Sequence, residues 1–282
     1  MTPSVPAVEL LLRHAREFGL DRLDAEVLLA EVCTWPRSRV IAHPERQVET
    51  AAADRFLTLA RRRAAGEPLA YLLGRRGFMD IEVEVSADVL IPRPETELLV
   101  TTALALDLPP EARILDLGTG SGAIALALAK ARPDWDILAT DVSSRALKVA
   151  RRNVRRIAPG RVHLVASDWF SALAPVRFDL LVSNPPYVAV NDPELDSCVA
   201  DHEPPRALFA ANDGLAALAQ LASTAPERLE PGGWILLEHG HRQGPSVRAM
   251  LEAAGLSAVR SIADGGERER VTIARRNGLP GG

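Results

Sequence analysis

The first part of the chain carries apolar residues at helical spacing. In residues 7–20 they recur every three or four positions, which places them on one face of a helix. Residues 21–33 and 51–66 repeat this pattern, and residues 68–74 begin with a proline and end with a glycine, as short helices do. No catalytic pair, ligand cluster or glycine loop accompanies them. The sequence therefore predicts a small all-α domain over residues 1–76, and we expect it to recognise a substrate.

The pattern changes in residues 77–100. Residues 79–86 alternate apolar and polar side chains with the period of two that half-exposed strands show. In the following segment, "IPRPETE", two prolines bracket Arg93, and a helix is expected to begin at Glu95 or Thr96. We therefore expect residues 77–100 to form a stiff linker that contains a β-hairpin and this charged segment.

Beyond residue 100, strand-like and helix-like segments alternate. The strand-like segments are residues 113–117, 136–140, 161–167, 178–183, 233–240, 256–262 and 268–276. Such alternation predicts a mostly parallel sheet with helices on both faces, and the ligands of such sheets bind beyond the carboxyl ends of the strands. We expect residues 101–276 to form a catalytic domain and residues 277–282 to be a disordered tail.

Composition restricts the function classes to be considered. The chain has 282 residues, of which 47% are hydrophobic, and its formal net charge is -4. An acidic balance argues against a broad basic face, so we expect no sequence-specific binding of nucleic acid. Short basic runs such as "RRNVRR" are interpreted as solvated helix faces.

Cysteine use and hydropathy indicate the compartment. Cys33 and Cys198 are far apart in the chain, which excludes a disulfide framework and a thiolate zinc site. The first residues lack the basic and apolar regions of a signal peptide, and no apolar run reaches the ~18 residues of a membrane-spanning helix. We therefore expect a soluble, cytoplasmic protein with no membrane partner.

A glycine-rich turn is the first candidate site. In "LDLGTGSGAIALALA" this turn joins a predicted strand to a predicted helix, and glycines let the backbone approach a ligand closely. The turn consists of Gly118, Thr119, Gly120, Ser121 and Gly122. Its spacing is compatible with NAD, but Asp116 would repel a pyrophosphate and would suit a ligand that carries an amino group. With this acid and three alternate glycines, the turn resembles motif I of S-adenosylmethionine-dependent methyltransferases.

Acidic and aromatic residues follow the next two strands. Asp141 is placed to accept hydrogen bonds from ribose hydroxyls, which NAD and S-adenosylmethionine both carry. It could equally cap the following helix, unless Ser143 or Ser144 does so. Asp168 could accept from an exocyclic adenine amine and Trp169 could stack on the adenine ring, although a turn with a core tryptophan gives the same pattern.

The fourth strand ends in a stiff segment, "NPPY", formed by Asn184, Pro185, Pro186 and Tyr187. It resembles motif IV of methyltransferases that act on a nitrogen conjugated with a π-system. Such a nitrogen is a poor nucleophile, so the enzyme must hold its N–H groups until the lone pair faces the methyl group. The Asn184 side-chain oxygen and the Pro185 carbonyl offer two fixed acceptors, and Tyr187 can pack on the planar amide and favour the sulfonium.

Three further titratable residues, Glu238, His239 and His241, follow the fifth strand. The two histidines could share a face, but no third ligand stands at a familiar spacing, so we expect a core-edge or loop role and no metal. The sequence assigns no role to Glu238.

Together these motifs resemble the HemK/PrmC family of protein-(glutamine-N5) methyltransferases, which modify peptide-chain release factors. The similarity extends over residues 67–271, and "IPRPETE" distinguishes the family from DNA methyltransferases that share the NPPY motif. The resemblance implies a Rossmann-like S-adenosylmethionine-dependent methyltransferase fold, with a mostly parallel seven-stranded sheet that follows a small all-α domain.

The resemblance also implies the activity and the site. The methyl group of S-adenosylmethionine would pass to the glutamine of a release factor's Gly-Gly-Gln motif. The glycine turn, Asp141, Trp169 and Asn184 would contact the cofactor, helped by Asp168, and the NPPY segment would bind the glutamine amide.

Three alternatives remain open from the sequence. A sister branch of the family methylates a ribosomal protein of the large subunit, and sequence physics separates the branches poorly. A DNA adenine-N6 methyltransferase would need a basic cleft, which the net charge of -4 disfavours. A non-catalytic nucleotide-binding module would have no use for an intact NPPY segment.

Overall fold

The computed structural model describes residues 5–192, 195 and 197–278, and most of the predicted tail lies outside these residues. Contacts divide the chain into two compact units, Met1–Gly74 and Arg75–Gly282. Each unit has its own core, so each is described by itself. No helix in the described part of the chain is both long and apolar enough to cross a membrane.

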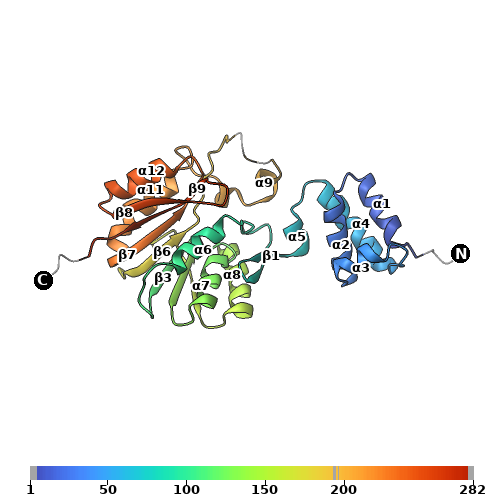
Figure 1. The fold of residues 1–282 in the computed structure, drawn as a ribbon, viewed down its shortest axis with the longest axis horizontal. Helices are drawn as coiled ribbons and strands as arrows, with labels where there is room; N and C mark the ends of the chain where they lie inside the picture. The colour runs from blue at the N-terminus through green and yellow to red at the C-terminus, as the bar shows by residue number, and fades with distance from the viewer. Residues whose placement is uncertain (1–4, 193–194, 196, 279–282) are drawn as a thin grey trace. The chain divides into compact units, whose positions relative to one another are not determined.

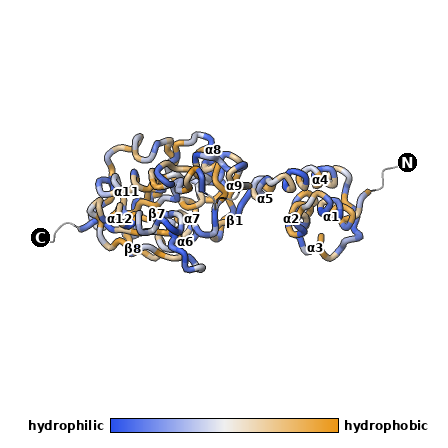
Figure 2. The backbone as a smooth tube through the Cα atoms, turned by 90° about the horizontal axis from the view of Figure 1, so that it is seen from above, coloured by the Kyte–Doolittle hydropathy of each residue, from blue (hydrophilic) through white to orange (hydrophobic). Residues whose placement is uncertain are grey.

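The first unit is entirely helical. Its helices are α1 (Val8–Glu17), α2 (Arg22–Cys33), α3 (Arg37–Ala42), α4 (Thr50–Ala64) and α5 (Leu69–Leu73). They alternate hydrophobic and hydrophilic residues along the chain (Figure 2), and α2 packs against each of the other four. Phe56, Leu28 and Leu29 are fully buried at the centre. Local chemistry sets the ends of the helices: Asp21 caps α2, and Gly74 ends α5 in the left-handed region.

The second unit begins with an antiparallel hairpin, β1 (Arg75–Phe78) and β2 (Ile81–Glu84), which starts two residues before the predicted linker. Asn153 fastens this hairpin to the sheet domain. Its Oδ1 accepts from the Glu84 backbone at 2.7 Å, and its Nδ2 donates to the Ser121 carbonyl at 2.9 Å. The hairpin therefore packs behind the glycine turn.

The rest of the second unit is a seven-stranded sheet with the order β5-β4-β3-β6-β7-β9-β8 (Figure 1). Its strands are β3 (Arg113–Leu117), β4 (Asp136–Asp141), β5 (Val162–Ala166), β6 (Phe178–Ser183), β7 (Leu229–Glu238), β8 (Ser257–Ala263) and β9 (Glu269–Arg275). All neighbouring pairs are parallel except the two that involve β9. The predicted fold class is confirmed.

Helices cover the sheet in two groups. α6 (Thr96–Leu104), α7 (Ala123–Ala131) and α8 (Ser144–Ile157) pack side by side, whereas α11 (Ala216–Arg228) and α12 (Gly244–Ala253) pack on each other and on β7, β8 and β9 (Figure 1). Two short helices, α9 (Ser197–His202) and α10 (Pro205–Leu208), follow β6. The core lies between the sheet and these layers and includes Leu115, Leu181 and Leu237.

The strand order reverses between β3 and β6 in the middle of the sheet. The chain runs from β3 to β4 and β5 on one side, then returns to place β6 and β7 on the other. The Ser183 hydroxyl donates to the Leu117 carbonyl at 2.7 Å and ties the carboxyl ends of the two central strands together. A reversal of this kind leaves a crevice beyond the strand ends, which is where open α/β sheets bind ligands.

Candidate active site

The register of the sheet brings the predicted site residues to one edge. Leu117 pairs with both Thr140 and Ser183, so the residues that follow them, Gly118, Asp141 and Asn184, leave the sheet beside one another. One strand further out on each side, Asp141 pairs with Ala166, and Ser183 pairs with Leu237. Hydrogen bonding of these strands therefore gathers loops that lie far apart in the sequence.

The glycine turn after β3 needs its glycines for their backbone conformation. Gly118, Gly120 and Gly122 have φ values of 75°, 56° and 86°, in the left-handed region that disfavours other residues. A Cβ on Gly118 would lie 3.6 Å from the Trp169 ring, whereas one on Gly120 would have no atom within 4 Å. The turn therefore presents bare backbone to open space at Gly120, as a cradle for a ligand requires.

Asp116 is buried beneath this turn. Its side chain has no exposed surface, and its Oδ2 accepts from the Thr119 hydroxyl at 2.6 Å. Within the described residues, its Oδ1 has no hydrogen-bond partner. Burial raises the pKa of Asp116 to about 7, although the bond from Thr119 and the nearby Ala125 backbone N–H act in the opposite direction. The unpartnered oxygen is the kind of acceptor that the amino group of a ligand satisfies.

The raised pKa of Asp116 predicts a pH-dependent stability. Because the folded-state pKa lies above the ordinary value of 3.8, the contribution of Asp116 to stability is complete below that value and is lost as the pH rises through about 7. Asp116→Asn does not titrate, so it should gain on the order of 2–4 kcal/mol of unfolding free energy relative to the wild type between pH 5 and 8. Urea unfolding at several pH values measures this difference.

Asp136 provides the matched control for this prediction. It is exposed at the start of β4, where the strands of the same sheet begin and not where they end. Asp136→Asn should leave the pH dependence of the unfolding free energy unchanged. A constant difference between Asp116→Asn and the wild type over this pH range would show that Asp116 is ionised in the folded protein throughout.

Asp141 has two duties at the end of β4. Its Oδ2 accepts from the Gly120 backbone at 2.9 Å and its Oδ1 from the Ser143 backbone at 2.8 Å, so it shapes the glycine turn. Ser143 itself caps α8 by accepting from Ala146. Burial raises the pKa of Asp141, and bonds from Ser143 and Gly120 and the nearby Arg206 oppose this. Asp141 is thus not wholly free, although each carboxylate oxygen keeps a second lone pair for a ligand.

The loop after β5 carries Asp168 and Trp169. Asp168 is exposed, whereas Trp169 is half-buried and packs against the main core cluster with its ring over Gly118. Trp169 has a φ of 49°, an uncommon conformation for a bulky residue. The backbone is therefore held in an unfavourable conformation that brings the indole beside the glycine turn.

The NPPY segment after β6 lines a pocket of about 210 Å³. Besides Asn184, Pro185 and Tyr187, the pocket is lined by Leu90, Arg93, Val188, Leu195, Val199, Ala207 and Leu208. Asn184 Nδ2 donates to Thr96 Oγ1 at 3.0 Å, at the first residue of α6. Since the nitrogen end of this amide is occupied by Thr96, the oxygen end is available as an acceptor.

Hydrogen bonds hold Tyr187 at its side-chain hydroxyl and at its backbone carbonyl. Its hydroxyl donates to Glu238 Oε1 at 3.3 Å, and its carbonyl accepts from Gln243 Nε2 at 3.0 Å. Gly214 approaches the same carbonyl so closely that a Cβ there would lie 2.1 Å from it. Burial raises the pKa of Tyr187, and Glu238 adds to this effect, so the phenol stays neutral.

Glu238 and His239 are buried at the end of β7. Burial is the main cause that raises the pKa of Glu238 to about 7. His239 Nε2 lies 2.7 Å from the Thr272 hydroxyl and its Nδ1 lies 2.9 Å from the Gly240 carbonyl, and burial lowers its pKa. These partners occupy both ring nitrogens of His239. Over the part of the chain that the structure describes, no cluster of three or more His, Cys, Asp or Glu side chains could hold a metal ion.

Glu203 joins two walls of the NPPY pocket. It is 3% exposed and accepts from the Ile91 backbone at 3.0 Å and from Arg93 Nη2 at 2.5 Å. It therefore connects the "IPRPETE" segment to the α9–α10 region. Nothing in the spacing of Arg93 and Glu203 along the chain points to this pair.

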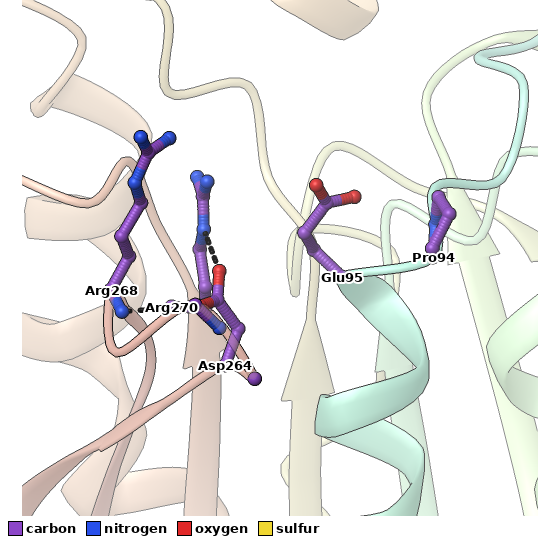
Figure 3. A pocket seen from close by; sticks show the side chains of 7 residues that line it. Pro94, Glu95, Asp264, Arg268 and Arg270 are labelled. Atoms are coloured by element: carbon purple, nitrogen blue, oxygen red, sulfur yellow. Dashed lines mark hydrogen bonds and ion pairs between the residues drawn. The ribbon is translucent and has the colours of Figure 1, made fainter.

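A second, larger hollow of about 440 Å³ lies between the start of α6 and the loop that joins β8 to β9. Figure 3 shows the Glu95 side chain on one side of it and Arg268 and Arg270 on the other, with Arg270 bonded to Asp264. None of the predicted site residues lines this hollow. The smaller pocket at the NPPY segment is therefore the better candidate for chemistry.

Comparisons with known proteins agree with this geometry. A family model of the PrmC N-terminal domain matches residues 7–74, and a model of the methyltransferase small domain matches residues 94–200. Over 276 residues the chain is 48% identical to a release factor glutamine methyltransferase of Xylella fastidiosa, covering 98% of this chain and 100% of the relative.

Two further proteins extend the comparison. A release factor glutamine methyltransferase of Escherichia coli is 44% identical over 254 residues, which cover 90% of this chain and 92% of the relative. A 16S rRNA methyltransferase of T. thermophilus, solved in complex with S-adenosylmethionine and guanosine, superposes with a TM-score of 0.52 at 22% identity. The match covers 72% of this chain and 50% of that one. At that identity the superposition supports the fold alone.

Proposed function

This chain belongs to the family of release factor glutamine methyltransferases, and from that premise we propose that it methylates a peptide-chain release factor on the side-chain amide nitrogen of a glutamine. The cofactor is S-adenosylmethionine. One observation carries the proposal: the pairing of Leu117 with Ser183 sets the glycine turn beside Asn184. A cofactor above the turn would then present its methyl group to a substrate in the NPPY pocket.

The residues around the turn fit this cofactor. We assign its amino group to the side of Asp116, whose Oδ1 has no other partner within the described residues, and its ribose to Asp141. The bare backbone at Gly120 gives room for close approach, and Trp169 provides an apolar face beside Gly118. Asp168, being exposed, is free to meet the edge of the adenine.

The chain's own residues have a simple task in methyl transfer. The bound cofactor supplies an electrophilic methyl group on a positively charged sulfur. The amide nitrogen of the substrate delocalises its lone pair, so Asn184 Oδ1 and the Pro185 carbonyl must accept its two N–H groups and turn the lone pair toward the methyl. Tyr187 packs against the amide plane. The nitrogen then loses one proton to solvent, which restores a neutral amide.

Asp141 is expected to control cofactor affinity. Asp141→Ala removes the acceptor for the ribose and also the bond to Gly120, and charge-assisted bonds are each worth on the order of 1.5–3 kcal/mol. The dissociation constant for S-adenosylmethionine should rise at least tenfold in a calorimetric titration, by that estimate. Asp136→Ala, at the far end of the same strand, is the control. Equal affinities for the two variants would remove Asp141 from the cofactor site.

We also propose that the helical unit binds the release factor. It matches the PrmC N-terminal domain and has a core of its own, and it carries none of the cofactor motifs. A protein that begins at Arg75 should still bind S-adenosylmethionine but should have a KM for intact release factor that is at least tenfold higher, because one interaction surface is lost. An unchanged KM would exclude this role.

The proposed function is tested by incubation with labelled S-adenosylmethionine and mass spectrometry of the candidate substrates. We expect one methyl group on the glutamine of the Gly-Gly-Gln motif of a release factor. Large-subunit ribosomal proteins and adenine-containing DNA serve as parallel substrates. Label in either of these, with none in a release factor, would refute the assignment.

A further inference from the structure

Behind the NPPY pocket, two polar side chains from separate segments contact the site residues. Asn184 Nδ2 donates to the Thr96 hydroxyl at 3.0 Å, and the Tyr187 hydroxyl donates to Glu238 Oε1 at 3.3 Å. Thr96 and Glu238 are 4% and 1% exposed. Neither residue has been given a role so far, yet buried polar groups are costly unless they are hydrogen-bonded.

The chemistry of these groups gives the hydrogen bonds a direction. Thr96 Oγ1 accepts from Asn184, so its single proton needs another acceptor. Thr96 lies close enough to the Glu238 carboxyl to lower its pKa. Within the described residues no donor satisfies Oε2 of Glu238, which leaves it as the acceptor for that proton. An ionised carboxylate only accepts hydrogen bonds. In the row of side chains Asn184, Thr96 and Glu238, each donor therefore faces toward Glu238.

We propose that Glu238 is a positioning residue that acts through Thr96 to orient the Asn184 amide, so that its oxygen and not its nitrogen faces the substrate. The two ends of a carboxamide are nearly alike in shape, so packing alone distinguishes them poorly. A flipped Asn184 would set its own N–H groups against those of the substrate amide. The catalytic consequence rests on the proposed function, whereas the orientation itself does not.

Other charged groups bear on Glu238. Glu95 disfavours its ionised form, and Arg270, whose neighbour Val271 pairs with Glu238 across the sheet, favours it. Both residues line the hollow shown in Figure 3. Since burial raises the pKa of Glu238 to about 7, the measurements belong near pH 8.5, where the carboxylate is ionised.

Glu238→Gln is the first test. It keeps the shape of the side chain but adds an amide that donates to Thr96 Oγ1. The Thr96 hydroxyl then donates its proton to Asn184. Asn184 must accept it with its side-chain oxygen, so that its nitrogen faces the substrate. We expect kcat to fall about tenfold or more, as for the loss of one well-placed hydrogen-bonding group.

The decisive test is a rescue. Asn184→Asp alone leaves one Thr96 proton for two carboxylates. When it is combined with Glu238→Gln, both hydrogen bonds reverse their direction. The new amide at position 238 donates to Thr96, and Thr96 donates to one oxygen of the new carboxylate at position 184. Its other oxygen accepts from the substrate. The double variant should therefore turn over release factor faster than either single variant.

Thermal unfolding separates this inference from the substrate assignment. The midpoint of the double variant should exceed the value expected from the sum of the two single shifts, and this measurement needs no substrate. Additive shifts would overturn the inference, as would a double variant slower than both single ones. If Glu238→Gln does not fold, Thr96→Val should lose turnover that Thr96→Ser retains, and equal turnover of these two variants would also overturn it.

Discussion

Replacing Asn184 with alanine should reduce kcat for release factor methylation by ~10²-fold or more, because the substrate amide loses the acceptor that aligns its lone pair. The structure holds the Asn184 nitrogen on Thr96 and thereby leaves the oxygen for the substrate. Without it, the amide can rotate about its remaining contact at the Pro185 carbonyl. Single-turnover kinetics with saturating cofactor would measure the chemical step directly.

Asn184→Asp is the companion variant. It keeps an oxygen acceptor and should retain more activity than Asn184→Ala, although Thr96 then has only one proton to share. Binding of S-adenosylmethionine is measured for both variants by calorimetry, since Asn184 is also a proposed cofactor contact. Near-normal turnover of Asn184→Ala would mean that the stiff NPPY segment only ends a strand.

Gly214→Ala should impair both folding and turnover, although Gly214 lies outside the glycine turn and the NPPY segment. A Cβ there would lie 2.1 Å from the Tyr187 carbonyl oxygen and 2.8 Å from Gln243 Nε2, and its φ is +83°. The clash is with backbone, so the NPPY segment or the loop of Gly214 must move. We expect a stability loss on the order of 2–4 kcal/mol and a fall in kcat of at least tenfold.

Gly255→Ala is the control, because Gly255 has nearly the same φ, +79°, with no atom within 4 Å of the added Cβ. It bears only the cost of the left-handed conformation, about 1–2 kcal/mol. Urea unfolding and turnover of the two variants isolate the contact with Tyr187. If both variants lose equal stability and turnover, the close approach of Gly214 to Tyr187 does not matter.

The sequence predicts the fold class because its signals are local. Alternation of strands and helices, the glycines after β3 and the prolines after β6 each follow from backbone rules that act over a few residues. The seven-stranded, mostly parallel sheet is confirmed. The roles of the candidate residues stay predictions, but Gly118, Asp141 and Asn184 do leave neighbouring strands at one edge.

Other features of the site could not be read from the sequence because they depend on distant side chains. Thr96 looks like the start of a helix, and Glu203 looks like a loop acid. Their bonds to Asn184 and Arg93 exist only once the sheet brings the segments together. Asp116 shows the same limit, since its position at the end of a strand does not reveal that the structure buries it fully. A pattern gives the residue type and its element, whereas burial depends on the complete fold.

The order of the strands has a consequence for a chain still under synthesis. The glycine turn follows β3, but its neighbour β6 comes much later, and Glu238 lies at the end of β7, later again. Domains fold in the order in which they leave the ribosome, so the helical unit can form first. Strand β3 can pair with β4 early, but it can pair with β6 only after residues 178–183 have been synthesised. A polypeptide truncated before β7 has the glycine turn and the NPPY segment but lacks the buried carboxylate behind them. Chains that terminate before β7 should therefore be unable to transfer the methyl group. Activity should arise only in the nearly completed chain.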